Sequence, residues 1–184
     1  MRLIETDVSV HPNFAAGVAF DPGVRYRFER LPSQDHRAEA QSALEQIAQT
    51  ALTKVGLLRA AESGDAGLSV LLGARSGTWI RDDEGRLYPS TGAFASPRFS
   101  FGIGIGVRSG YLGVRLPITY LHRHEISLIL RDLRSARIVY ETQAFHEGPW
   151  ADTAALYSVM LDAALEGFPR PAATTVRVRR EIPR

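Results

Sequence analysis

The stretch EISLILRDLRSARIVYETQAF, residues 125–145, predicts the fold more directly than any other part of the chain. Two apolar-rich segments flank a short polar connection, Asp132–Ala136. The second segment, Ile138–Phe145, is rich in the β-branched and aromatic residues that favour strands. A tight turn between two such segments joins antiparallel neighbours. We therefore predict a β-hairpin from Glu125 to Phe145.

A first helix is predicted between Ser33 and Val55, because apolar residues recur there at three- and four-residue spacing. Ser33 is a candidate N-cap, and Asp35 lies in the first turn, where the helix dipole favours an anion. Gly56 follows the last apolar position and fits a left-handed C-cap. One face of this helix should therefore pack on a core while the other meets water.

A second helix is predicted from about Trp150 or Asp152, with Leu156 on its apolar face and a stop at Gly167 and Pro169. Strands are predicted around the two helices, at Leu3–Val10, Val24–Leu31, Leu57–Ala61, Leu68–Ala74, Tyr111–Leu121 and Thr174–Arg180. The run of consecutive strands and the amphipathic helices favour a single α/β domain of the α+β type over residues 1–184. We expect a mainly antiparallel sheet with two amphipathic helices packed on one face, and not a doubly wound fold.

Composition narrows the classes of function. The chain has 184 residues, and its 45% hydrophobic content suits one soluble, folded domain. No apolar run is long enough to cross a bilayer, so no transmembrane segment is expected. The formal net charge of +2 gives no strong field for nucleic acid, so we expect no nucleic-acid partner. The absence of cysteine excludes disulfides, thiolate catalysis and cysteine metal sites in this chain.

The N-terminal residues MRLIETDVSVHPNF lack the apolar core and the small-residue cleavage site of a signal peptide. Taken literally, they indicate a cytoplasmic chain. They also suit a mature domain whose export signal was removed and replaced by Met1.

Four glycines punctuate the stretch SFGIGIGVRSG, residues 100–110. A dinucleotide or phosphate loop would place them between a strand and a helix, and neither the required glycine spacing nor a following helix is present. Gly102, Gly104 and Gly106 instead alternate with apolar residues at the period of a strand. The pattern predicts a strand with one bare glycine face, or else a mobile loop, and no cofactor.

Three histidines offer candidate metal ligands. His122 and His124 would point to the same face of a strand, and the predicted hairpin would bring His146 near His122. Three imidazoles on one sheet face could bind zinc. The alternative is that these are histidines without function at the end of a strand.

Nucleophilic catalysis has weaker support, because no serine lies in a G-x-S-x-G motif. Asp82 and Asp83 suit a hairpin tip at Arg81–Arg86 better than a calcium site. The arginines of the last predicted strand could contact phosphates or an anionic membrane, but a solvated edge strand explains them more simply. We predict no catalytic residues.

Four features resemble a family of bacterial lipoproteins, the domain of unknown function 4136 family. They are the capped helix leading to Asp65–Val70, the glycine- and aromatic-rich middle Phe99–Tyr111, the hairpin ending in Ile138–Tyr140, and a helix before Phe168–Pro169. The sequence departs from this family at Tyr140, where Trp is frequent, and in lacking the lipid-bearing N-terminal cysteine.

The resemblance implies an exported protein on the periplasmic side of the bacterial envelope, anchored to the outer membrane by a lipid. The expected function is therefore a non-catalytic binding or structural module with an envelope protein or a membrane lipid anchor as partner. Alternatives are a small-ligand or metal-binding protein using the histidine-bearing hairpin face and, third, a hydrolytic enzyme. The family implies no catalytic residue.

Overall fold

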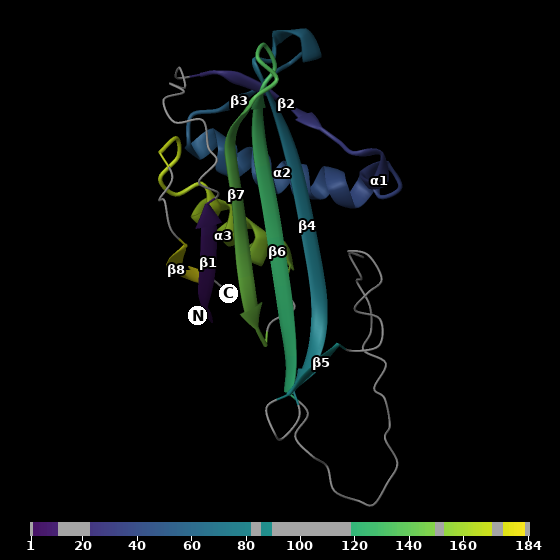
Figure 1. Ribbon diagram of the computed structural model, residues 1–184, viewed down its shortest axis with the longest axis vertical. Coiled ribbons are helices and arrows are strands. Elements are labelled where there is room, and N and C mark those ends of the chain that lie inside the picture. The colour runs from purple at the N-terminus through teal and green to yellow at the C-terminus, as the bar shows by residue number, and fades with distance from the viewer. Residues whose placement is uncertain are drawn as a thin grey trace, which may run out of the picture.

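The computed structural model describes residues 2–10, 23–81, 86–89, 119–149, 153–170 and 175–182. The chain combines strands and helices in an α+β arrangement (Figure 1). The strands are β1 (Arg2–Val10), β2 (Arg25–Glu29), β3 (Leu58–Arg59), β4 (Leu68–Arg81), β5 (Leu87–Pro89), β6 (Thr119–Asp132), β7 (Ile138–Gly148) and β8 (Val176–Ile182). The α-helices are α1 (Pro32–Asp35), α2 (Ala38–Lys54) and α3 (Thr153–Ala164), and a short 3₁₀ turn, η1, covers Ser63–Asp65.

The strands form one eight-stranded sheet in the order β3-β2-β4-β6-β7-β1-β8, with β5 pairing to β4 outside this path. β4 and β6 are antiparallel along their whole length, from Leu68 opposite Asp132 to Arg81 opposite Thr119. β2 runs parallel to both β3 and β4, and the other pairings are antiparallel. The predicted mainly antiparallel α+β fold is confirmed.

The two longer helices cover one face of the sheet, behind the strands in Figure 1. α2 packs against α3, β3 and β4, and α3 packs against β1, β6, β7 and β8. Side chains alternate along β6, so His124, Ile126, Leu128 and Leu130 are buried while the residues between them are partly exposed. We call the face toward α2 and α3 the inner face and the opposite one the outer face.

The C-terminus of α2 ends as the sequence predicts. Gly56 has a φ of 87°, the left-handed region in which glycine carries no side-chain penalty. The Leu57 N–H donates to the Leu52 carbonyl at 3.0 Å, and the Gly56 N–H donates to the Thr53 carbonyl at 3.0 Å. This pair of bonds is the Schellman motif, which satisfies carbonyls at the end of the helix.

The N-terminus of the first helix differs from the prediction. Ser33 is not the N-cap, because α1 begins at Pro32 and Ser33 lies inside its single turn. The cap is Leu31, whose N–H donates to Gln34 Oε1 at 2.7 Å while the Gln34 N–H donates to the Leu31 carbonyl at 2.8 Å. Arg37 then leaves the helical region, with φ −135° and ψ 40°, so the expected single helix is divided into α1 and α2.

The predicted hairpin is confirmed, and Glu125 and Phe145 are direct partners across β6 and β7. The prediction of two separate strands before the turn is wrong. β6 continues without a break through His122 and His124, because β4 and β7 hold it from both sides. The predicted strand residues 111–118 lie outside the described part of the chain.

A buried tyrosine anchors the end of α3 to the sheet. Tyr140 of β7 has no exposed surface, and its hydroxyl donates to the Ala164 carbonyl at 2.9 Å. Its ring meets the Phe168 ring edge-on, with centroids 5.1 Å apart. Tyr140 therefore uses both its ring and its hydroxyl, as buried tyrosines do when an acceptor is within reach.

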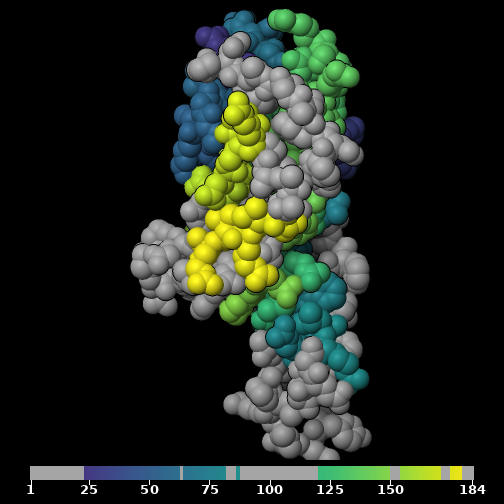
Figure 2. Space-filling model, turned by 60° about the vertical axis from the view of Figure 1, so that its left-hand side comes forward, coloured from purple at the N-terminus to yellow at the C-terminus, as the bar shows by residue number. Residues whose placement is uncertain are grey.

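The two terminal strands pair with each other. β1 lies between β7 and β8, and its pairing with β8 runs from Arg2 opposite Ile182 to Val8 opposite Val176. β8 is thus an edge strand, as the sequence predicts. Figure 2 shows it in yellow at the surface, while the teal and green ends of the central strands extend below the helices.

Within the described residues, no helix combines the length and the apolar character that crossing a lipid bilayer requires.

Candidate binding site

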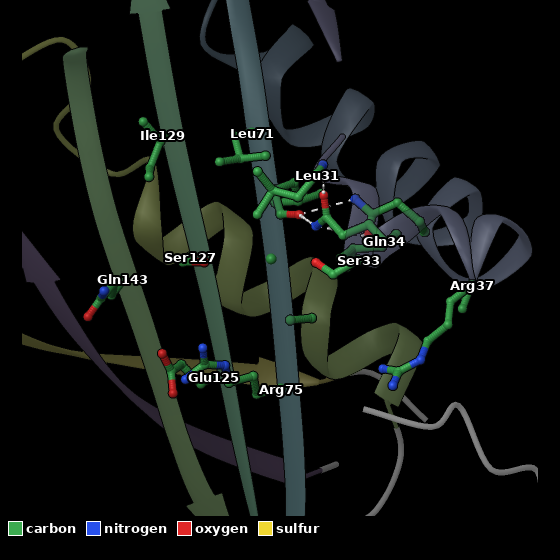
Figure 3. A pocket seen from close by; sticks show the side chains of 16 residues that line it. Leu31, Ser33, Gln34, Arg37, Leu71, Arg75, Glu125, Ser127, Ile129 and Gln143 are labelled. Carbon is green, nitrogen blue, oxygen red and sulfur yellow. Dashed lines mark hydrogen bonds between the residues drawn. The ribbon is translucent and has the colours of Figure 1, made fainter. Parts of the chain in front are cut away.

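A hollow of about 470 Å³ lies where one edge of β4 meets the corner between α1 and α2 (Figure 3). Leu31, Ser33 and Gln34 line it from the helical side. Leu71 and Arg75 line it from β4, and further outer-face residues of β6 and β7 complete the floor. Its lining mixes apolar, amide and charged side chains, as ligand sites commonly do.

The hollow exists because β4 has a free length of edge among the described strands. β6 occupies one edge of β4 throughout, so β2 and β5 share the other edge. β2 pairs only as far as Leu71, and β5 pairs only from Trp79 onward. We refer to the part between them, Leu72–Thr78, as the edge window.

Backbone groups of alternate residues point into the edge window. In an antiparallel ladder, a residue directs both its N–H and its C=O to the same side, and the side alternates along the strand. The Leu72 carbonyl points away from β6, since side chains of α1 and α2 bind it. Ala74, Ser76 and Thr78 therefore direct their N–H and C=O groups into the window, and no hydrogen bond from another described residue reaches them there.

Two glutamines close one end of the window. Gln34 Nε2 donates to the Leu72 carbonyl at 2.7 Å, and Gln41 Nε2 donates to the same carbonyl at 3.1 Å. Gln41 is only 8% exposed, so this bond is shielded from water. Side chains of α1 and α2 thus bind the Leu72 carbonyl, which a further residue of β2 would bind if β2 continued.

Charge on the floor of the hollow comes from a cross-strand pair. Arg75 of β4 and Glu125 of β6 are direct partners on the outer face. Neither side chain forms a hydrogen bond or an ion pair in the described part of the protein. On the same face, Gly73 lies so close to Ser127 that a Cβ at residue 73 would be 2.7 Å from Ser127 Oγ. Residue 73 is therefore a glycine, and no side chain covers the backbone there on the outer face.

The three candidate histidines lie on the inner face, away from this hollow. His124 and His146 are direct partners across β6 and β7 and are 3% and 5% exposed. His122 is opposite Gly148, so the expected pairing of His146 with His122 is displaced by two residues. The described residues include no group of three or more His, Asp or Glu side chains placed to hold a metal ion.

The surroundings of these histidines are those of packed core residues. The His124 ring meets the Tyr157 ring edge-on with centroids 5.7 Å apart. Burial raises the pKa of Tyr157 above its usual value, although a hydrogen bond with Ser76 opposes the shift. Burial also lowers the pKa of His122, whose Nδ1 lies 3.2 Å from Thr78 Oγ1, so His122 is neutral at pH 7.

Sequence reasoning missed the residues that shape the hollow. Gln34 and Gln41 carry no motif, and their common partner Leu72 is 38 and 31 residues away. The one available signal was the distribution of charge, because Arg75 is the one charged residue between Leu68 and Ile80. The glycine stretch at 100–110 and the pair Asp82 and Asp83 lie outside the described residues.

Comparison with known proteins gives only distant structural matches. No model of a known protein family matches the chain, and no curated protein matches it. A PDZ domain protein from Parabacteroides distasonis ATCC 8503 is 12% identical, with a TM-score of 0.48; the match covers 97% of this chain but only 38% of that one. The PelC dodecamer from Paraburkholderia phytofirmans is 12% identical, with a TM-score of 0.49 and coverage of 91% of this chain and 99% of that chain.

Proposed function

We propose that this protein is a non-catalytic binding module of the bacterial cell envelope, facing the periplasm and held at the outer membrane by a lipid anchor. It binds an envelope partner in the hollow beside β4. No catalytic step is part of the proposal.

The observation that carries the binding role is the construction of the hollow. One wall is fixed by the paired bonds of Gln34 and Gln41 to Leu72. The floor presents Arg75 and Glu125, whose charges no other described side chain neutralises. A site that combines a fixed wall with uncommitted charged side chains is suited to binding, because the wall itself needs little ordering when a partner arrives.

Support for the envelope location comes from the sequence. The capped helix, the Glu125–Phe145 hairpin and the helix before Phe168 resemble the lipoprotein family named above. Members of that family are exported and lipidated, so the native gene is expected to encode an apolar signal and a lipid-bearing cysteine upstream of Met1.

The test is made in cells that express the native gene with a C-terminal epitope tag. We expect the tagged protein in the membrane fraction and labelled by radioactive palmitate. A photo-crosslinking amino acid at Ser33, which lines the hollow and is exposed, should form an adduct with a partner. The same amino acid at Arg134, exposed in the β6–β7 turn, is the matched control.

Two results would contradict the proposal. Tagged protein found in the cytoplasm without palmitate would overturn the envelope location. Adducts at Ser33 no stronger than those at Arg134 would overturn the binding role of the hollow.

A further inference from the structure

We infer that the edge window accepts an extended segment of a partner protein as an added β-strand, with an acidic side chain of that segment over Arg75. The inference rests on the proposed binding function and names the chemical class of its partner. The occupant is a peptide strand, not a small molecule and not a second copy of this chain.

The backbone of the edge window carries the first part of the inference. Ala74, Ser76 and Thr78 present both a donor and an acceptor on the free side of β4. Only another extended backbone offers acceptors and donors at the matching repeat of about 7 Å for every second residue. Strand addition of this kind is a recurrent mode of peptide recognition.

The ends of the window define the length of the segment. Gln34 and Gln41 occupy the Leu72 carbonyl at one end, and β5 begins to pair at Trp79 at the other. Six residues, 73–78, lie between Leu72 and Trp79, which corresponds to roughly 20 Å of strand. An added strand of about six or seven residues fills this length.

The side chains beside the window define the chemistry of the segment. Along β4, the outer-face positions of the window are Gly73, Arg75 and Gly77, so Arg75 contributes the one large side chain there. It is exposed and has no ionic partner among the described residues. The residue of the added strand opposite Arg75 would lie within reach of its guanidinium, and a carboxylate there forms a cross-strand ion pair.

Apolar side chains belong on either side of that acidic residue. On one side of Arg75 the hollow is lined by Leu31, which is 48% exposed, and by Leu71 and Ile129; on the other side, Trp79 lies on the same face of β4, four residues after Arg75. Residues two positions before and after the acidic one point to the same face and would cover these side chains. The expected segment therefore has the pattern apolar, any residue, acidic, any residue, apolar.

The sequence of β8 argues against a second copy of this chain. Within the described sheet, the other long strand at an edge is β8, of sequence VRVRREI. Its single acidic residue, Glu181, has Arg179 and not an apolar residue two positions before it, so β8 lacks the pattern that the window favours.

The test uses three fluorescein-labelled peptides of sequence Thr-Val-Thr-X-Thr-Val-Thr, in which X is Asp, Ser or Lys. Binding to the purified chain is measured by fluorescence anisotropy at low salt. We expect the Asp peptide to bind roughly fivefold more tightly than the Ser peptide, the upper range for a partly exposed ion pair, and the Lys peptide to bind least. The Arg75→Glu variant should reverse this order, whereas Arg134→Glu, with the same charge change in a distant exposed turn, should not.

Amide hydrogen exchange followed by NMR locates the bound peptide. In the free protein, the amides of Ala74, Ser76 and Thr78 should exchange faster than those of Gly73, Arg75 and Gly77, which face β6. Adding the Asp peptide should slow the exchange of the Ala74, Ser76 and Thr78 amides.

The outcomes separate the inference from the function on which it rests. Window amides already protected in the free protein would mean that the chain itself or a second copy fills the window, which overturns the inference. Equal affinity for the three peptides, or an order unchanged by Arg75→Glu, would overturn the acidic partner. Either result obtained together with strong crosslinking at Ser33 would leave the hollow as a binding site for another class of ligand, whereas absent crosslinking would remove the proposed function itself.

Discussion

Asp132 organises the turn that joins β6 to β7. Its Oδ1 accepts hydrogen bonds from the Arg134 N–H at 2.8 Å, the Ser135 N–H at 2.6 Å and the Ser135 hydroxyl at 3.1 Å. The turn also contains Ala136 at a φ of 58°, a conformation that costs a non-glycine residue free energy. The bonds to Asp132 hold the chain in this conformation.

The same bonds make the turn sensitive to acid. Hydrogen bonds, the largest of them from the Ser135 backbone, hold the pKa of Asp132 below its usual value. A lowered pKa in the folded state adds stability above the unfolded-state pKa of about 4, and this stability is lost as the pH falls through the folded-state pKa. Asn keeps an acceptor oxygen but lacks the charge, and solvent screens that charge, so replacing Asp132 with Asn should reduce the free energy of unfolding by only about 0.5 kcal/mol at pH 7.

The difference between the native protein and Asp132→Asn should shrink below pH 4. Urea unfolding at pH 7, 5 and 3 measures it, and Glu62→Gln, at an exposed residue, serves as the control. A difference that stays constant across this range would contradict the role assigned to the carboxylate.

Tyr140→Phe tests the link between β7 and α3. The substitution keeps the ring contact with Phe168 but leaves the buried Ala164 carbonyl without its donor, so the free energy of unfolding should fall by about 1–2 kcal/mol. Chemical denaturation measures the change. Tyr120→Phe, at a residue that is 46% exposed, should change stability by less than about 0.5 kcal/mol, and equal effects would argue against the buried bond.

At the scale of elements, an ion pair ties the chain after β2 to α2. Arg30 Nε and Nη2 donate to Glu45 Oε1 and Oε2 at 2.7 and 2.8 Å, and Nη2 also donates to Ser42 Oγ at 3.0 Å. Glu45 is only 4% exposed. The hydrogen bonds to Glu45 raise the pKa of Arg30, so Arg30 stays charged at every ordinary pH.

A double-mutant cycle of Arg30→Ala and Glu45→Ala should give a coupling energy of about 1–2 kcal/mol, because the carboxylate is buried and its geometry is bidentate. The pair Lys54 and Asp162, which links α2 to α3 at 2.7 Å, is the matched comparison. It is more exposed, so its coupling should stay below about 1 kcal/mol. Unfolding in urea measures both cycles, and a larger coupling for Lys54 and Asp162 would contradict the ranking.

The elements differ in how far the sequence predicts them. The hairpin and the end of α2 depend on residues that are adjacent in the chain. The turn at Asp132 and the C-cap at Gly56 could therefore be predicted from the sequence. The break between α1 and α2 depends on Gln34 and Gln41 reaching Leu72, a contact that local periodicity does not encode. The length of β6 likewise comes from its pairing with β4 and β7. The intrinsic strand propensity of the residues around His122 does not predict this pairing.

At the scale of the whole molecule, the amphipathic pattern of the sequence was sufficient to predict the class of fold, because it indicates which faces of the helices and strands must be buried. It was insufficient for the candidate site. The edge window exists because β2 stops pairing at Leu71 and β5 starts at Trp79, and both limits are set by non-local register. The histidines were placed on one face correctly, but a register displaced by two residues changed the partner of His146.

The pairing of β1 with β8 has a consequence for how the chain could be cut and rejoined. Because Arg2 lies opposite Ile182, a short turn joining residue 182 to residue 2 would make the two terminal strands an ordinary hairpin. The N and C labels of Figure 1 lie near each other accordingly. New ends could then be opened in the exposed turn at Gly64, giving a circular permutant in which every described strand pair is kept. The order of the strands along the chain is thus separable from their order in the sheet.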